Sequence, residues 1–267
     1  MPSVPFSPSW RSNGGRKVKR LLLMSSSRVG ELGYLAHARE QIDLVLEGRA
    51  KRVLFVPYAG GITSTYDAYE AMARPAFEQG GFEFESIHRQ DPHRAIAGAE
   101  AIAIGGGNTF ALLKRLYDER IVDAIRERVN DGMPYIGWSA GGNVACPTIR
   151  TTNDMPIVQP PTLRALGLIH FQINPHFISG KPPGHNGESR EERLAEFLAI
   201  NPGEHVVALP EGTALLVDGA AGMILGSQAA LHFVEPNVAG RLKANEAFNL
   251  GDVKGPVIDG SWPIAKQ

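Results

Sequence analysis

The sequence has little cysteine, little net charge and no long hydrophobic run. Cys146 is the single cysteine among 267 residues, so an internal disulfide is impossible and the cytoplasm, a reducing compartment, is the expected location. The 27 basic and 28 acidic side chains almost balance, which argues against nucleic acid or a membrane as a partner. No apolar run approaches the roughly 18 residues that a membrane-spanning helix needs.

The sequence also lacks the motifs of metal and nucleotide enzymes. It has no H-E-x-x-H and no pair of cysteines, so we expect neither a metal ion nor another cofactor. It has no G-x-x-x-x-G-K-[ST], and Phe110 occupies the third glycine position of the dinucleotide fingerprint. Residues 1–16 contain no continuous apolar segment, so a disordered leader is expected there instead of a secretory signal.

The sequence does contain an alternation of short apolar runs and longer amphipathic runs. The expected strands lie at 18–24, 52–59, 82–88, 99–107 and 133–139, with helices at 34–47, 65–79 and 109–130. This alternation predicts an α/β fold with a mainly parallel sheet flanked by helices.

The second half of the chain changes in character. An apolar run over 166–177 precedes an expected helix at 188–200, and the later runs "HVVALP", "TALLVDG", "GMILG" and "ALHFV" predict short antiparallel strands at one edge. We therefore expect a single α/β domain over residues 17–235. Residues 236–267 form a tail without an assigned role.

Three glycine-containing turns follow expected strands: "YAGGIT" (58–63), "GGGNTF" (105–110) and "GWSAGG" (137–142). Because ligands of open parallel sheets bind at the carboxyl ends of the strands, these turns predict a site at that edge. The "GGGNTF" turn can be interpreted as a phosphate-binding loop or as a source of N–H groups for an oxyanion, and we favour the second interpretation.

Ser139 lies in a G-x-S-x-G pattern, which is typical of a nucleophile held on a sharp strand-to-helix turn. A serine nucleophile needs a base, and His176 in "INPHF" is expected on a loop at the end of a strand. His185, on another loop, is a candidate substrate contact. For the acid that orients the base, local sequence leaves Asp154 and Glu211 both open.

Four longer segments are much more specific to one family than G-x-S-x-G alone. They are "IGGGNTFALLK", "YIGWSAGGNVACPTIRTTNDMPIV", "QINPHF" and "GHNGESREER". Their order and spacing resemble peptidase E, a family of α-aspartyl dipeptidases, from about residue 19 to about residue 235. The resemblance implies a three-layer fold similar to class I glutamine amidotransferases, a serine nucleophile, no metal and a homodimer. It also implies Asp-X dipeptides as substrates.

The resemblance implies Ser139 as the nucleophile and His176 as the general base. Both Asp154 and Glu211 match positions that have been assigned as the third member, and we favour Glu211 because it follows the end of a strand. The further roles that the resemblance implies are oxyanion donors at Gly107 and Ala140, a pocket contact at Asn108, and recognition of the aspartyl carboxylate by Arg190.

Arg150 is a second candidate for recognition of the aspartyl carboxylate, because it also follows the serine turn. Gly142 departs from the family, which commonly has alanine there. Two alternatives stay open: a hydrolase of aspartyl-arginine polymer resembling the cyanophycinases, and a non-catalytic small-molecule binder with the same fold.

Overall fold

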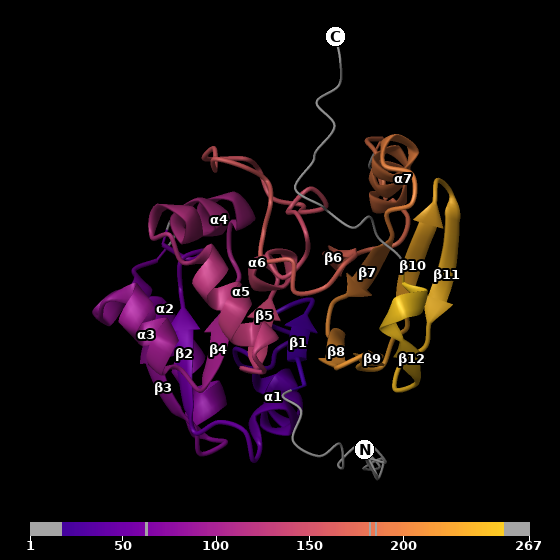
Figure 1. Ribbon diagram of the computed structural model, residues 1–267. Helices are drawn as coiled ribbons and strands as arrows, with labels where there is room; N and C mark the ends of the chain where they lie inside the picture. The colour runs from indigo at the N-terminus through magenta and orange to yellow at the C-terminus, as the bar shows by residue number, and fades with distance from the viewer. Residues whose placement is uncertain (1–17, 62–63, 182, 185, 254–267) are drawn as a thin grey trace.

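The computed structural model describes residues 18–61, 64–181, 183–184 and 186–253, which form two sheets with helices packed on them (Figure 1). The expected leader, residues 1–16, lies outside this range. None of the helices in the described part of the chain combines the length and hydropathy that crossing a membrane requires.

The larger sheet has eight strands in the order β12-β9-β8-β1-β5-β4-β2-β3. Strands β1, β5, β4, β2 and β3 are parallel, whereas β8, β9 and β12 form an antiparallel edge. The bounds are β1 (Arg20–Met24), β2 (Arg52–Val56), β3 (Glu83–Ser86), β4 (Ala101–Ile104), β5 (Tyr135–Trp138), β8 (Ala214–Asp218), β9 (Ala221–Leu225) and β12 (Ala247–Asn249). The predicted fold class, a mainly parallel sheet flanked by helices with antiparallel strands near the C-terminus, is confirmed.

Helices cover both faces of this sheet. Helices α1 and α2 pack on one face, and α3, α4, α5 and α6 pack on the other. The bounds are α1 (Arg39–Leu46), α2 (Tyr66–Glu78), α3 (Pro92–Gly98), α4 (Thr109–Asp118), α5 (Val122–Asn130), α6 (Ala140–Asn143) and α7 (Arg190–Ile200). The helix expected over 109–130 is in fact two helices, because Arg120 adopts a φ of 56° and so ends the first one.

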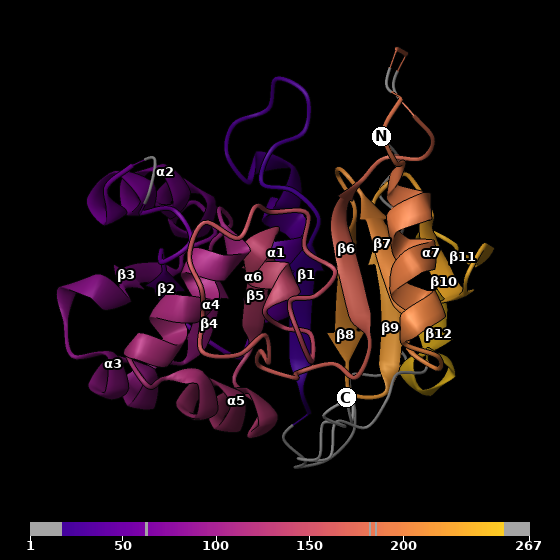
Figure 2. The ribbon, with the colours of Figure 1, turned by 90° about the horizontal axis from the view of Figure 1, so that it is seen from above.

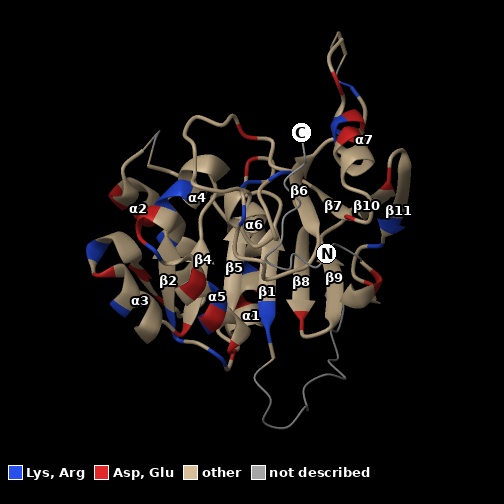
Figure 3. Ribbon diagram, turned by 45° about the horizontal axis from the view of Figure 1, so that its top comes forward, with Lys and Arg blue, Asp and Glu red and all other residues tan. Residues whose placement is uncertain are grey.

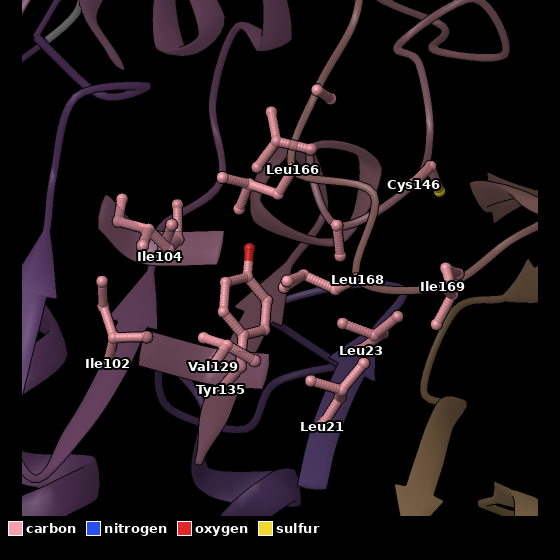
Figure 4. Close-up of a cluster of buried hydrophobic side chains, with 14 of the residues drawn as sticks. Leu21, Leu23, Ile102, Ile104, Val129, Tyr135, Cys146, Leu166, Leu168 and Ile169 are labelled. Atoms are coloured by element: carbon pink, nitrogen blue, oxygen red, sulfur yellow. The ribbon is translucent and has the colours of Figure 1, made fainter. Parts of the chain in front are cut away.

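The central strand β1 explains why the core forms on both sides of the sheet. Leu21 and Leu23 point into the cluster under α4 and α5, while Leu22 and Met24 point toward α1 and α2. All four are buried, as a strand covered on both faces requires. Figure 4 shows the first cluster around Tyr135, whose hydroxyl donates to the Gly141 carbonyl at 2.6 Å.

The smaller sheet has the order β11-β10-β7-β6, with β6 (Gln172–Phe177) parallel to β7 (Val206–Pro210). Strands β10 (Ala230–Glu235) and β11 (Val238–Leu242) complete it antiparallel. Figure 2 shows this sheet beside the larger one, with α7 lying along it. Inner side chains of β6 and β7 enter the main core, and α7 covers the opposite face.

The sequence predicts that all the later strands lie at one edge of a single sheet, and this prediction is wrong because they are divided between two sheets. β8 and β9 lie at the antiparallel edge of the larger sheet, whereas β7 and β10 belong to the smaller sheet. A short apolar run fits a strand of either sheet, so the pairing with distant strands decides which sheet it joins. Residues 238–249, in the tail without an assigned role, add β11 and β12 to the two sheets.

Charged residues lie mostly on helices and loops (Figure 3). At the start of β1, the Arg20 guanidinium pairs with Asp218 of β8 at 2.8 Å, and both side chains are largely buried. This pair lies at the end of the sheet opposite to the glycine turns. The glycine turns lie at the other end, where β1, β4 and β5 have their carboxyl ends, and this is the edge at which the sequence predicts a binding site.

Candidate active site

Ser139 lies at the sharp turn between β5 and α6, the local structure that the G-x-S-x-G motif predicts. Its φ of 51° lies in the left-handed region, which a residue with a side chain rarely occupies, so the turn is strained. Its N–H donates to the Met24 carbonyl at 3.0 Å. A Cβ at Gly137 would overlap the Gly141 carbonyl, and one at Gly141 would overlap the Ile104 carbonyl. Both glycines are required by this close packing.

Ser139, His176 and Glu211 form one hydrogen-bonded series. The Ser139 Oγ lies 2.9 Å from Nε2 of His176, and Nδ1 of the same ring lies 3.0 Å from Glu211 Oε1. The carboxylate can only accept, so the network assigns the proton to Nδ1 and leaves Nε2 to accept from the serine. The side chains of His176 and Glu211 are 39% and 60% exposed. The series is thus open to a substrate from solvent.

His176 lies inside β6 and not on a loop beyond the strand, which corrects the sequence expectation. Its φ is 54°, and the pairing of β6 with β7 shifts register between Asn174 and Phe177. A bulge of this kind turns a side chain away from the regular alternation of the strand. Here the bulge directs the imidazole toward Ser139.

Asp154 occupies a different position from Glu211. Its Oδ2 accepts from the Thr109 N–H at 2.8 Å, from the Thr109 hydroxyl at 2.5 Å and from the Thr152 hydroxyl at 3.2 Å. Thr109 is the first residue of α4, so the carboxylate faces a helix N-terminus, where negative charge is favoured. Of the two candidate acids, the structure brings Glu211 to the imidazole and Asp154 to α4.

The loop after β4 packs against the serine turn. A Cβ at Gly106 would lie 3.0 Å from the Ser139 Cβ, so the loop backbone touches the nucleophile. Gly107 has a φ of 136°, which favours glycine. The Tyr69 hydroxyl donates to the Gly106 carbonyl at 2.9 Å and fixes the loop. Ala140, the first residue of α6, is fully buried directly behind the serine.

Asn108 caps α4. Its Oδ1 accepts from the Ala111 N–H at 3.0 Å, and its Nδ2 donates to the Met155 carbonyl at 2.8 Å. The side chain therefore joins the loop after β4 to the segment that follows Asp154. His185, the candidate substrate contact, lies outside the described residues.

Arg190 begins α7 and points toward the segment that carries Asp154. Its guanidinium donates to Asn153 Oδ1, and Asn153 Nδ2 donates to the Pro175 carbonyl at 2.8 Å, next to His176. Burial, and to a lesser extent the charge of Arg193, lower the pKa of Arg190. A half-buried cation held beside the strand of the histidine is suited to bind an anionic group.

Arg150, the other candidate for carboxylate recognition, is hydrogen-bonded to residues after α7. It donates to Glu204 and to Asn201, and its guanidinium lies 4.9 Å from the centre of the Phe197 ring. The side chains of Arg150 and Glu204 are 14% and 6% exposed. This largely buried pair joins the segment after α6 to the end of α7.

Two other groups are candidates for a function: Cys146 as a nucleophile, and an acidic cluster near α2 as a metal site. Burial raises the pKa of Cys146 to about 12, so its thiol stays protonated near neutral pH. Asp67, Glu70 and His88 come close enough together to hold a metal ion. However, Arg89 already pairs with both carboxylates of that cluster.

The sequence predicts no role for the serines of "MSSS" (24–27) or for Asn153. The structure brings Ser25 Oγ within 2.9 Å of the His176 N–H, and Asn153 against Arg190. A signal was present for the serines, because they follow a buried strand at the same sheet edge as the three glycine turns. No comparable local signal marks Asn153.

A hydroxyl, an imidazole and a carboxylate in hydrogen-bonded series at a nucleophile turn are typical of a hydrolase. The model of peptidase family S51 matches residues 21–225. A peptidase E of Actinobacillus pleuropneumoniae serotype 5b is 50% identical over 234 residues, which cover 87% of this chain and 100% of that protein. A peptidase E of Haemophilus influenzae is 52% identical over 214 residues, 79% of this chain and 98% of that protein.

Solved structures show the same fold at lower identity. A peptidase from an acI-B1 actinobacterium has a TM-score of 0.66 and 19% identity, over 87% of this chain and 97% of that one. A putative peptidase E of Listeria monocytogenes EGD-e has a TM-score of 0.60 and 21% identity, over 79% of this chain and 100% of that one. The chain is a peptidase. It belongs to peptidase family S51, as a member of the peptidase E family.

The position of Asp154 predicts a stability defect. Asp154→Ala removes the acceptor at the N-terminus of α4, and we expect the free energy of unfolding to fall by about 1–2 kcal/mol in urea titrations, the scale for losing a cap. Asp118→Ala, at the exposed end of the same helix, is the control, and we expect a change within about 0.5 kcal/mol. Equal effects in the two variants would contradict this role.

Proposed function

We propose that this protein is a serine-type dipeptidase that hydrolyses dipeptides with an N-terminal aspartate. One observation carries the proposal: Glu211, His176 and Ser139 stand in hydrogen-bonded series at a strand-to-helix turn, where Ser139 is half-buried. Membership of the peptidase E family supports a peptide bond as the target, and the resemblance of the sequence motifs supplies the aspartyl preference.

In the proposed reaction, the Ser139 hydroxyl attacks the carbonyl carbon of the substrate aspartate while His176 Nε2 accepts its proton. Backbone N–H groups of Gly107 and Ala140 stabilise the oxyanion. The C–N bond then breaks, and His176 returns the proton to the leaving amine. Water, deprotonated by the same imidazole, hydrolyses the aspartyl ester and restores Ser139.

We assign the orienting acid to Glu211. Its contact with Nδ1 holds the ring in the tautomer that the reaction needs, and its charge stabilises the imidazolium that forms. Asp154 supports α4, directly after the loop that carries Gly107, instead. This assignment rests on the separate hydrogen bonds of the two carboxylates.

We assign recognition of the aspartyl side chain to Arg190. Its planar guanidinium can make two parallel hydrogen bonds to a carboxylate, which a lysine cannot copy. Its partner Asn153 is neutral and aims it without neutralising its charge. Arg150, by contrast, is already paired with the carboxylate of Glu204.

The direct experiment is a panel of X-Leu dipeptides, assayed with and without a chelator. We expect Asp-Leu to be the preferred substrate, EDTA to leave the rate unchanged, and Ser139→Ala to lose on the order of 10⁶ in kcat. Folding of the variant, checked by circular dichroism, is the control. More than a few per cent of residual activity would exclude the serine mechanism.

Two other results would favour the alternatives. Hydrolysis of aspartyl-arginine polymer in preference to Asp-Leu would indicate an activity like that of the cyanophycinases. Binding of dipeptides without turnover by the wild-type protein would indicate a non-catalytic binder.

Glu211→Gln tests the third member of the series. We expect kcat to fall by up to about 10⁴-fold, because an amide can stabilise the wrong tautomer and carries no charge. Asp154→Asn is the matched control and should lower kcat far less. The opposite order of losses would assign the orienting role to Asp154.

Arg190→Ala tests the specificity assignment. We expect kcat/KM for Asp-Leu to fall by about 2–4 kcal/mol of transition-state binding, the scale for leaving a desolvated charge unpaired. The residual rate with Asn-Leu, which lacks that charge, should barely change. An equal proportional loss with both dipeptides would remove Arg190 from the specificity pocket.

A further inference from the structure

The groups of the proposed site come from two different sheets. Ser139 follows β5 of the larger sheet, whereas His176 lies in β6 and Glu211 follows β7 of the smaller sheet. Packing of apolar side chains between the sheets is not directional, so it does not by itself fix the imidazole to within a hydrogen-bond length of the serine. A directional contact between the sheets is needed at this edge.

The ladder between β6 and β7 is interrupted beside the histidine. Asn174 pairs with Ala208 and Phe177 with Pro210, so β6 has one residue more than β7 in this interval. Pro175 has no N–H to donate. The bulge thus leaves the backbone groups around His176 outside the regular pattern.

Ser25, which directly follows β1 of the larger sheet, takes over the missing pairing. Its Oγ accepts from the His176 N–H at 2.9 Å and donates to the Leu209 carbonyl at 2.8 Å. The serine is 0% exposed, so water does not compete for these bonds. One hydroxyl therefore bridges β6 and β7 and ties both to the larger sheet.

The neighbours of Ser25 make matching contacts. The Met24 carbonyl accepts from the Ser139 N–H at 3.0 Å, and the Ser26 hydroxyl accepts from the Gly212 N–H at 3.2 Å, next to Glu211. Three consecutive residues, Met24, Ser25 and Ser26, thus each hold one segment of the site. We call residues 24–26 the β1 clamp.

We propose that Ser25 and Ser26 are positioning residues: the β1 clamp sets His176 and Glu211 in register with Ser139. This inference rests on the proposed function, because it assigns the serines a part in the reaction of that series. Ser25 acts through the backbone of His176, and Ser26 acts through the turn that carries Glu211.

The test compares Ser25→Ala with Ser86→Ala, a serine that is also 0% exposed but lies in β3 at the far edge of the larger sheet. We expect both variants to be less stable in urea, because each loses the two hydrogen bonds of a buried hydroxyl. At equal folded fractions, Ser25→Ala should lose about 100-fold in kcat with Asp-Leu and little in KM, the scale for a displaced catalytic group. Ser86→Ala should keep the wild-type kcat.

Combination with His176→Ala separates positioning from a general structural defect. If Ser25 acts through the imidazole, Ser25→Ala should cost no further residual activity in that background. A full additional loss there, or a wild-type kcat in folded Ser25→Ala, would overturn the role of Ser25.

Ser26→Ala removes one hydrogen bond and decides the question if Ser25→Ala fails to fold. We expect a loss of kcat that disappears in a Glu211→Gln background. A wild-type kcat in the folded variant would overturn the β1 clamp. Failure of the proposed function itself gives a different result, since Ser139→Ala would then retain activity.

Discussion

The hydrogen bond between Ser139 and His176 joins two sheets, and its 2.9 Å length exists only while those sheets keep a fixed relative position. Hydrogen bonds weaken steeply with distance and misalignment, so the chemistry of the site depends on this one interface. Side chains from β6 and β7 enter the same core as β1 and β5 and hold the sheets together. The β1 clamp adds direction to that packing.

Two of the six described non-glycine residues with a positive φ are the reacting groups themselves. Ser139 and His176 both have φ values in the left-handed region, and Gly107, at φ 136°, lies in the loop that touches the serine. Such conformations cost about 1–3 kcal/mol each for residues with a side chain, so the surrounding structure must impose them. The strands that carry them are buried, which provides that constraint.

Much of this could be predicted from the sequence because the decisive signals are local. The apolar runs indicated the parallel sheet, and Gly137 and Gly141 indicated the turn at Ser139. The second sheet and the bulge at His176 could not be predicted, since they depend on pairing between distant strands. For the same reason, the sequence favoured Glu211 over Asp154 only on its place after the end of a strand. The positions of α4 and β7 separate the two carboxylates, because Asp154 contacts α4 and Glu211 contacts the imidazole.

Labelling with a serine-directed fluorophosphonate tests the central claim, an activated Ser139, most directly. Peptide mapping should find the label on Ser139, and Asp-Leu should slow its attachment by occupying the site. A protein that hydrolyses Asp-Leu but carries no label on Ser139, or carries it on another residue, would contradict the account.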